Sequence, residues 1–192
     1  MMGLLSTIRG KKDKDGQALG AAQIGPIASK TKKLVIAELP KMLAEKPDLF
    51  TVIWLRSAQR STSIKLAFGI SLDENPENNE AFVAFSSTIQ SFFHKLIVTY
   101  ELDDELVVTS CEQLGARHVD FISRGFHSHF WDIFMVCMAE TIDETLSSYM
   151  HDDEKRNEMI IAWQRVVNAI VHHMREGYSE RRKQELGAKN GS

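Results

Sequence analysis

Cysteine, proline and long apolar runs are all scarce in this sequence. Only two of its 192 residues are cysteine, and four are proline. Cys111 and Cys137 lie inside apolar helical patterns without CxxC spacing, so no disulfide framework is expected and a reducing, cytoplasmic location is favoured. We expect two buried, inert thiols, with a redox-active pair as the alternative. No unbroken apolar run of roughly eighteen residues occurs, which speaks against a membrane span.

Neither sign of charge dominates the chain. The formal net charge is -3, with 26% charged and 43% hydrophobic residues. This balance is typical of a soluble globular protein and provides no bulk field to attract nucleic acid, so no nucleic-acid partner is expected. The length predicts one domain with tails. We expect a flexible basic N-terminal tail over residues 1–29, a single domain over 30–180 and a polar C-terminal tail over 181–192.

Helical periodicity is present almost throughout the region between the tails. Apolar residues recur at steps of three and four, which places them on one face of a helix. The expected helical stretches are 29–50, 48–61, 80–100, 106–118, 126–150 and 154–178. Pro40 should kink or split the first of them. No convincing strand pair is present, so the predicted class is all-α, with six to eight helices.

The stretch EQLGARHVDF, residues 112–121, contains a histidine on an apolar helix face. Its stripe consists of Val107, Cys111, Leu114 and His118. Zinc is a poor interpretation, because a zinc site needs three or four protein ligands and His118 has no partner at helical spacing. Cys111 lies two turns away, about 11 Å along a helix, too far for a nucleophile–base pair. One histidine does suffice for a haem, since the porphyrin supplies four nitrogens. A packed histidine is the alternative.

Three stretches, taken in order, resemble the proximal half of a globin. They are EQLGARHVDF, FHSHFWDIFMVCMAETIDETL and AWQRVVNAIVHHMREGY. Leu114-Gly115-x-x-His118 is similar to the family's proximal-histidine motif. Upstream, IWLRSAQRSTSIKLAFGI resembles the turn that leads to an aromatic residue on the haem, and Phe68 takes the place of that aromatic residue.

The resemblance covers residues 30–180 and is closest to the neuroglobin-like and nematode globins. It implies a globin fold around haem b, iron protoporphyrin IX. His118 would ligate the iron through one ring nitrogen, while its other ring nitrogen donates to an acceptor that fixes the tautomer. Leu114 would pack beneath the porphyrin, and Phe68 would stack against the porphyrin edge.

The residues expected above the iron depart from the family pattern. Aligning the helix at 80–100 with the family's apolar positions puts Phe85 in the distal slot and Ile89 beside the gas ligand. Trp54 should point into the same pocket. This side is apolar, whereas oxygen-storing globins usually place a histidine or glutamine there, so only the Trp54 indole N–H is left as a donor. His94 lies about 13.5 Å past Phe85 along the axis and should not reach the iron. A register slip that allows internal ligation is the alternative.

The resemblance implies an intracellular globin that binds a diatomic gas, O2, CO or NO, at iron held by one proximal histidine. A hydrogen-bond donor in a dry pocket contributes about 1–3 kcal/mol, so its absence favours redox or gas sensing over oxygen storage. One-electron cycling of the iron would need an external electron donor as a partner. Two alternatives stay open. One is a haem-free globin-fold adaptor that binds a protein or lipid; the other is a haem redox enzyme such as a nitric oxide dioxygenase, nitrite reductase or peroxidase.

The N-terminal segment carries a separate signal. MGLLSTIRGKKDK, read from Met2, fits the myristoylation pattern with Gly3 as the acylated residue, and a basic cluster follows. Together they would bring the chain to a membrane surface. Acylation requires initiation at Met2, and a solvated basic tail is the alternative.

The histidines other than His118 show no pattern typical of ligands. We expect each to be partly exposed: His94, His127, His129, His151, His172 and His173. Because His172 and His173 are neighbours in the chain, they should point to different sides of a helix and make a poor metal site.

Overall fold

The computed structural model describes residues 25–190, and all regular secondary structure in that range is helical. Its α-helices are α1 (Ser29–Glu45), α2 (Leu49–Arg60), α3 (Thr62–Ala67), α4 (Glu80–His94), α5 (Asp104–Arg117), α6 (Phe130–Tyr149) and α7 (Asp153–Asn190). Shorter 3-10 and π segments are η1 (Pro76–Asn78), η2 (Lys95–Thr99) and η3 (His118–Arg124). The predicted all-α class with six to eight helices is confirmed.

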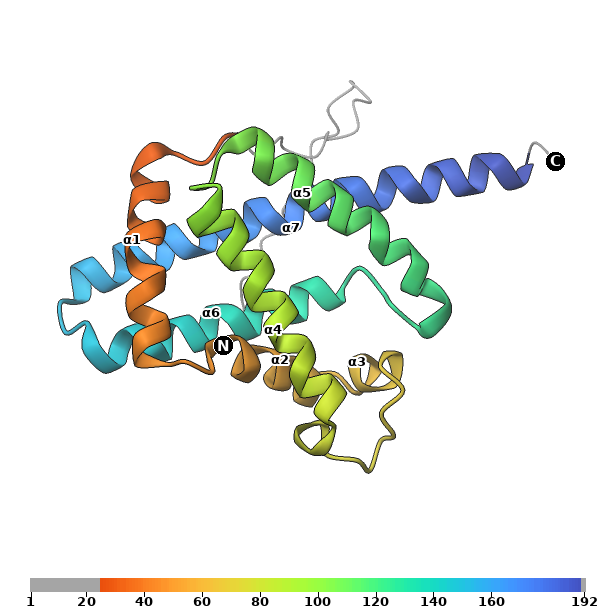
Figure 1. Cartoon of the computed structure of the whole chain (residues 1–192), viewed down its shortest axis with the longest axis horizontal. Coiled ribbons are helices and arrows are strands. Elements are labelled where there is room, and N and C mark those ends of the chain that lie inside the picture. The colour runs from red at the N-terminus through yellow and green to blue at the C-terminus, as the bar shows by residue number, and fades with distance from the viewer. Residues whose placement is uncertain (1–24, 191–192) are drawn as a thin grey trace, which may run out of the picture.

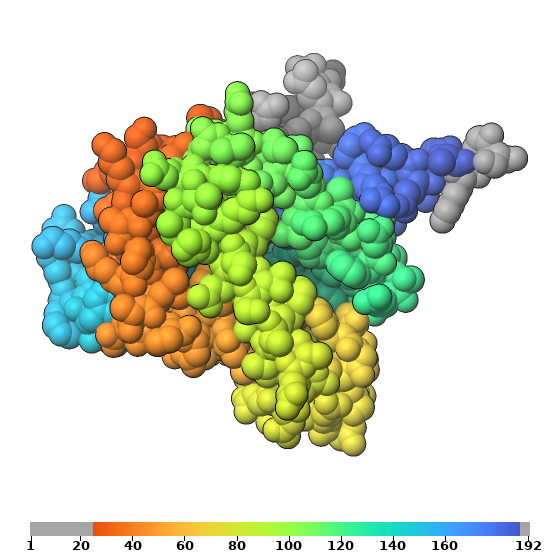
Figure 2. Space-filling view, in the orientation of Figure 1, coloured from red at the N-terminus to blue at the C-terminus, as the bar shows by residue number. Residues whose placement is uncertain are grey.

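Helices α4 and α5 diverge from one tight turn to form a V, and α3 lies at its open end, beside η3 (Figure 1). The turn is sharp because Glu101 and Leu102 both adopt positive φ. Burial of the Leu102 side chain helps to hold it. The Asp103 carboxylate then accepts the backbone N–H of Leu106 at 3.1 Å and starts α5. Figure 2 shows the surface hollowed between the arms of the V, with α6 behind. The C-terminal end of α5 therefore lies at the open side of this hollow.

Helices α5 and α7 cross with their backbones in direct contact. A Cβ atom at Gly115 would lie 1.8 Å from the carbonyl oxygen of Met174, and one at Gly177 would lie 2.0 Å from that of Glu112. Side chains cannot approach a backbone so closely, so both positions require glycine. The crossing explains the glycine three residues before His118, because Gly115 sets how closely α5 packs on α7.

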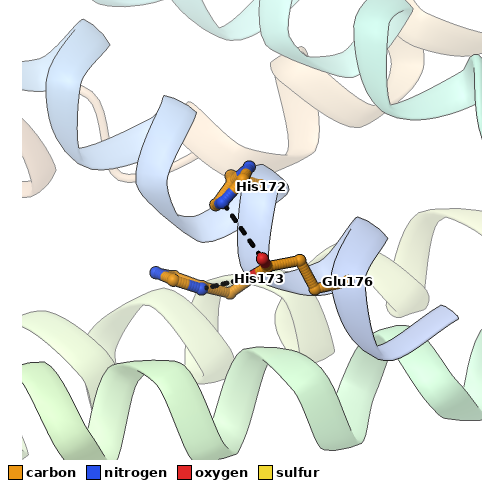
Figure 3. Close-up of side chains that lie close together, drawn as sticks. All are labelled: His172, His173 and Glu176. Carbon is orange, nitrogen blue, oxygen red and sulfur yellow. Dashed lines mark hydrogen bonds and ion pairs between the residues drawn. The ribbon is translucent and has the colours of Figure 1, made fainter. Parts of the chain in front are cut away.

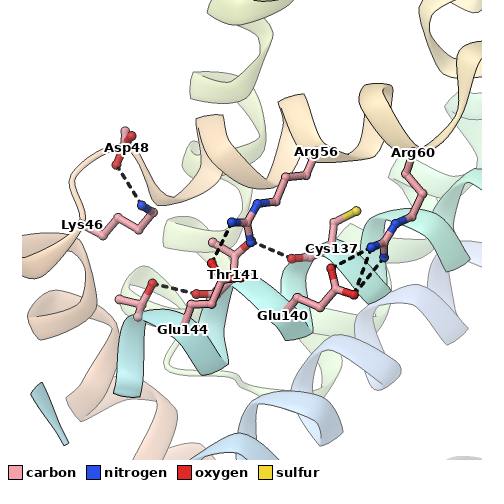
Figure 4. A network of polar contacts seen from close by, with 9 residues as sticks. Lys46, Asp48, Arg56, Arg60, Cys137, Glu140, Thr141 and Glu144 are labelled. Carbon is pink, nitrogen blue, oxygen red and sulfur yellow. Dashed lines mark hydrogen bonds and ion pairs between the residues drawn. The ribbon is translucent and has the colours of Figure 1, made fainter. Parts of the chain in front are cut away.

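Helices α2 and α6 are tied together by polar contacts along one edge (Figure 4). Arg56 forms an ion pair with Glu144 at 2.7 Å, and one turn later Arg60 pairs with Glu140 at 3.1 Å. Arg56 also donates to the hydroxyl of Thr141 at 3.1 Å. The i,i+4 spacing within each helix places both pairs on matching faces. These contacts hold α2 against α6, and the hydrogen bond to Glu144 raises the pKa of Arg56.

The first helix is not split where its proline predicted a break. Pro40 lies inside α1 and is exposed, and the helix continues to Glu45. Val35 and Met42, on either side of Pro40, are fully buried. Their packing keeps the helix continuous, because burying this apolar stripe contributes more free energy than one lost backbone hydrogen bond costs.

The C-terminal segment that was expected to be a polar tail is helical as far as residue 190. Arg181 pairs with Glu185 one turn later at 3.0 Å, and it also pairs with Asp120 of η3 at 3.0 Å. These contacts support a helix that the polar composition did not predict, and in Figure 1 this end of α7 projects from the body. Of the predicted N-terminal tail, residues 1–24 lie outside the described residues, as does the predicted lipidation of Gly3.

By length and composition alone, the helical stretch Glu80–Thr99 could cross a membrane. Serine, threonine and glutamine interrupt its apolar residues, which is why no unbroken apolar run marks it in the sequence. In the fold this stretch is α4 and η2, and its Phe82, Phe93 and Ile97 side chains are buried. A core helix has the same composition, so this finding is weak evidence for a membrane span.

Candidate functional site

His118 lies at the C-terminal end of α5, with one ring nitrogen bound to the helix backbone. Its Nδ1 stands 2.8 Å from the carbonyl oxygen of Leu114. Because a carbonyl can only accept, Nδ1 carries the proton and Nε2 keeps a free lone pair. Burial lowers the pKa of His118 and outweighs the hydrogen bond to Leu114, which raises it; the charge of Arg117 lowers it further. The ring is therefore neutral near pH 7, which is the form that ligates a metal.

Three aromatic side chains surround the His118 ring. The ring centroids of Phe126, Trp131 and Phe121 lie 4.9, 5.2 and 5.9 Å from that of His118. Phe126 reaches the histidine because the chain turns back at Gly125, whose φ of 94° favours glycine. The sequence interpretation assigned none of these aromatic residues to the site. Their position directly after the histidine motif was the only signal that could have found them.

Rings from α2, α4 and the end of α3 form a second aromatic cluster, which we call the aromatic wall. The Trp54 ring lies 5.1 Å from Phe68 and 5.4 Å from Phe85. It stacks on Phe82 at 4.6 Å. Phe68 and Phe85 are themselves 5.2 Å apart. The structure thus brings together three of the residues that the sequence proposed for cofactor binding, Trp54, Phe68 and Phe85.

A hydrogen bond between helices shows which face of α4 is turned toward α2. The hydroxyls of Thr51 and Ser86 lie 2.8 Å apart, so Ser86 faces α2. Phe85 precedes Ser86 by one residue, a rotation of about 100°, and Ile89 follows Phe85 one turn later on the same face. Ile89 is half-buried and packs against both apolar clusters of the core. Phe85 and Ile89 therefore share one face of α4.

The Trp54 indole is already hydrogen-bonded within the protein. Its N–H donates to the carbonyl oxygen of Phe82 at 2.9 Å, and the side chain is buried. Trp54 therefore has no donor to offer a gas ligand, and Phe85 and Ile89 have none by chemistry. His94, the last residue of α4, is exposed. The distal residues that were predicted from the sequence form an apolar surface without a free hydrogen-bond donor.

Two of the aromatic side chains at the hollow are unusually accessible for their size. Phe68 is 45% exposed and Phe85 is 39% exposed. Further large apolar side chains are exposed in α3, η3 and the loop after α3: Leu66, Leu72, Phe121 and Ile122. Exposed apolar side chains on the contacting elements α3 and η3 indicate a surface for an apolar partner. Together with one neutral imidazole, these residues fit a haem, whose porphyrin is flat and largely apolar and whose iron accepts a single histidine.

Neither cysteine belongs to a reactive site. Cys111 of α5 and Cys137 of α6 are both free and buried. Burial raises the pKa of Cys111 to about 12 and also raises that of Cys137. A thiol with a raised pKa carries little thiolate at neutral pH, and the thiolate is the reactive form. The geometry therefore favours the interpretation of two inert thiols over a redox-active pair.

The prediction that His172 and His173 point to different sides of the helix is wrong, because both rings turn toward one carboxylate (Figure 3). Both side chains are half-buried, as predicted. His172 Nε2 lies 3.4 Å from Glu176 Oε1, and His173 Nδ1 lies 2.8 Å from Glu176 Oε2. Neighbouring residues of a helix are separated by about 100°, but a residue three or four positions later falls between them. Glu176 occupies that intermediate position, so two side chains that start in different directions meet at its carboxylate.

Comparison with known proteins gives a family match over the part of the chain that contains the candidate site. A family model described as Globin matches residues 52–174 of the chain. That range contains all six residues proposed for the site: Trp54, Phe68, Phe85, Ile89, Leu114 and His118. Globin-related protein glb-13 of Caenorhabditis elegans is 30% identical over 69 residues, which are 36% of this chain and 22% of that protein. The aligned segment thus spans only about a fifth of the length of this relative.

Proposed function

The chain belongs to the globin family, and from that premise we propose that His118 holds haem b and that a diatomic gas binds at its iron. The family implies a haem cofactor in general. The observation that carries the proposal is the hydrogen bond from His118 Nδ1 to Leu114, which leaves Nε2 unprotonated. A haem held there by His118 would supply an iron atom that can bind O2, CO or NO.

The groups around His118 orient its imidazole ring and exclude water from it. The carbonyl oxygen of Leu114 retains the proton on Nδ1, so the ring cannot rotate without losing a hydrogen bond. Phe126 and Trp131 pack on the ring and keep the surroundings apolar. A neutral imidazole in such surroundings resists protonation, which would otherwise compete with ligation of the metal. These three contacts together fix the direction of the Nε2 lone pair.

The aromatic wall and Ile89 provide an apolar surface without a free hydrogen-bond donor. Bound dioxygen is retained best where a side chain donates a hydrogen bond to it, whereas CO and NO depend much less on such a bond. Because the Trp54 N–H is engaged with the Phe82 carbonyl, Phe85 and Ile89 would exclude water without discriminating in favour of O2. We infer that the protein serves in gas sensing or one-electron redox signalling, with an external electron donor as partner, and not in oxygen storage. A cytoplasmic location stays a prediction.

The test is the visible absorption spectrum of the purified full chain with haem added, in the ferric form, after reduction, and after reduction with CO. We expect a Soret band, and a broad reduced spectrum that sharpens with CO. The His118→Gly variant should lose this spectrum and recover it with imidazole in the buffer, because free imidazole replaces the missing ring. The His94→Ala variant is the matched control and should behave as the unmodified chain.

Three outcomes would contradict the proposal. Absence of a Soret band after addition of haem would favour the haem-free adaptor. Split, sharp bands in the reduced protein before gas is added would mean that the chain supplies a sixth ligand, so the placement of Phe85 over the iron would be wrong. Sustained turnover of nitrite, peroxide or nitric oxide with a reductant would favour the redox enzyme over passive gas binding.

A further inference from the structure

His172, His173 and Glu176 of α7 form a second group of potential metal ligands, separate from His118. The nitrogen or oxygen atoms that His172, His173 and Glu176 would use as ligands all lie within 4.8 Å of one another. Within the described residues, this is the only group of three histidine, cysteine or carboxylate side chains that could hold a metal ion. We propose that His172, His173 and Glu176 bind one divalent transition-metal ion of the zinc type.

The spacing between these atoms is close to that of a metal site. Zinc lies about 2.0–2.2 Å from imidazole nitrogen and carboxylate oxygen, and tetrahedral geometry then separates two ligand atoms by about 3.4 Å. His172 Nε2 stands 3.4 Å from one oxygen of Glu176, and His173 Nδ1 stands 2.8 Å from the other. Small side-chain rotations are therefore enough to direct all three groups at one ion, without movement of the helix backbone (Figure 3).

The charges around Glu176 leave its carboxylate available. Its ion-pair partners among the described residues are the two histidines and no lysine or arginine. The neighbouring Arg175 is directed elsewhere, because its guanidinium pairs with Asp132 of α6 at 2.6 Å. A bound cation would thus gain the negative charge of Glu176 without displacing an arginine or lysine.

The ligand types point to a particular class of ion. Two imidazoles and one carboxylate suit zinc, copper and nickel, whereas calcium and magnesium prefer oxygen ligands only. Three protein ligands would leave one position of a tetrahedral site open to water. The His172 and His173 side chains are 21% and 16% exposed, so the ion would be partly shielded and still reachable from solvent.

The binding experiment uses the full chain with haem, after dialysis against a chelator, and titrates Zn²⁺ in competition with a zinc-binding dye. We expect one Zn²⁺ per chain at this site. His172→Ala and His173→Ala should each weaken binding about tenfold or more, and Glu176→Gln should weaken it about tenfold while keeping the shape of the side chain. The melting temperature should rise with Zn²⁺ in the unmodified chain, because the ion binds only the folded helix, and should not rise in the variants.

Two controls separate this site from the rest of the molecule. His127 and His129 are also close, with ring centroids 5.6 Å apart, but share no carboxylate. Replacement of both by alanine should leave the Zn²⁺ affinity unchanged. His118→Gly should also leave it unchanged, so failure of the haem proposal and failure of this one are distinguishable. The proposal is overturned if the His172→Ala, His173→Ala double variant binds Zn²⁺ as tightly as the unmodified chain, or if binding follows His127 and His129.

Discussion

The side of the molecule around His118 and the aromatic wall differ in what holds their side chains in place. On the α5 side, His118 is bonded to its own helix, and α5 itself rests on α7 at Gly115. On the α3–α4 side, Phe68 and Phe85 touch other aromatic rings but leave large parts of their surfaces exposed. The His118 side, called the ligating wall after its proposed role, is thus preorganised by backbone contacts. The aromatic wall is only half covered by protein, so an apolar ligand bound there would complete its packing.

This difference has a thermodynamic consequence. Interactions made within the protein contribute to its stability at all times, whereas those completed by a ligand contribute only when the ligand is bound. Substitutions on the α5 side should therefore change the free energy of unfolding, and substitutions at Phe85 should mainly change ligand binding. The following four predictions test this division, from the largest expected effect to the smallest.

Substitution of Gly115 by alanine should break the ligating wall. The new Cβ would lie 1.8 Å from the Met174 carbonyl oxygen, which belongs to a backbone and cannot turn aside. Separation of α5 from α7 should cost about 3 kcal/mol or more of unfolding free energy, measured by urea denaturation. Gly187→Ala is the matched control: it meets no atom within 4 Å and should gain about 0.5–1 kcal/mol from helix propensity. Equal effects of the two substitutions would disprove the close crossing.

Substitution of Phe85 by histidine should add a hydrogen-bond donor to the aromatic wall and so slow the release of oxygen. A donor placed there should slow oxygen dissociation about tenfold to a hundredfold, measured by stopped-flow mixing, and should change CO release far less. The unfolding free energy should change little, since Phe85 is already 39% exposed. Leu66→His, on the more exposed α3, is the control and should leave the oxygen rate as it was. An unchanged oxygen rate in Phe85→His would place Phe85 away from the ligand.

Substitution of Trp54 by phenylalanine should remove one hydrogen bond and keep the ring stack on Phe82. We expect a loss of about 1 kcal/mol from the missing 2.9 Å contact, on top of the cost of the smaller ring. Trp163→Phe is the matched comparison, because the buried Trp163 indole N–H has no hydrogen-bond partner within the described structure. The cost at Trp54 should therefore exceed that at Trp163 in urea denaturation. If the oxygen off-rate changed in Trp54→Phe, the N–H would have a role in ligand binding after all.

The smallest effect is expected from acid acting on His118 in the haem-free chain. Burial lowers the pKa of His118 below the ordinary histidine value of about 6.5, so the unfolded chain takes up a proton at a higher pH than the folded chain does. Stability from this group is complete above pH 6.5 and is lost as the pH falls from there toward the lowered pKa. Urea denaturation at a series of pH values should show this slope, and His118→Gln should reduce it. An unchanged slope in the variant would mean that other groups cause the acid sensitivity.

The ligating wall was the easier part to predict from the sequence, for a physical reason. The stripe that carries Leu114 and His118 is defined by residues within about three turns of one helix, and the hydrogen bond between them spans about one turn. Phe126 and Trp131 were missed as contacts of His118, because they reach it only through the turn at Gly125. That turn depends on backbone angles which residue type alone does not specify.

Two other expectations treated helices as isolated objects. Pro40 was expected to kink or split α1, but buried residues on both sides keep the helix from splitting. His172 and His173 were compared only with each other, and the side chain that unites them, Glu176, lies one turn away. In both cases, residues outside the pattern that was considered decide the outcome: the buried neighbours of Pro40 in one and Glu176 in the other.

The length of α7 makes it a lever. Its 38 residues span about 57 Å, and α5 crosses it at Gly177. Gly177 divides α7 into about 36 Å before the crossing and about 20 Å beyond it, so the C-terminal arm is the shorter one. The Arg181–Asp120 ion pair joins this arm to η3, the segment that begins at His118. A displacement of the C-terminal arm would therefore be passed along η3 to the histidine.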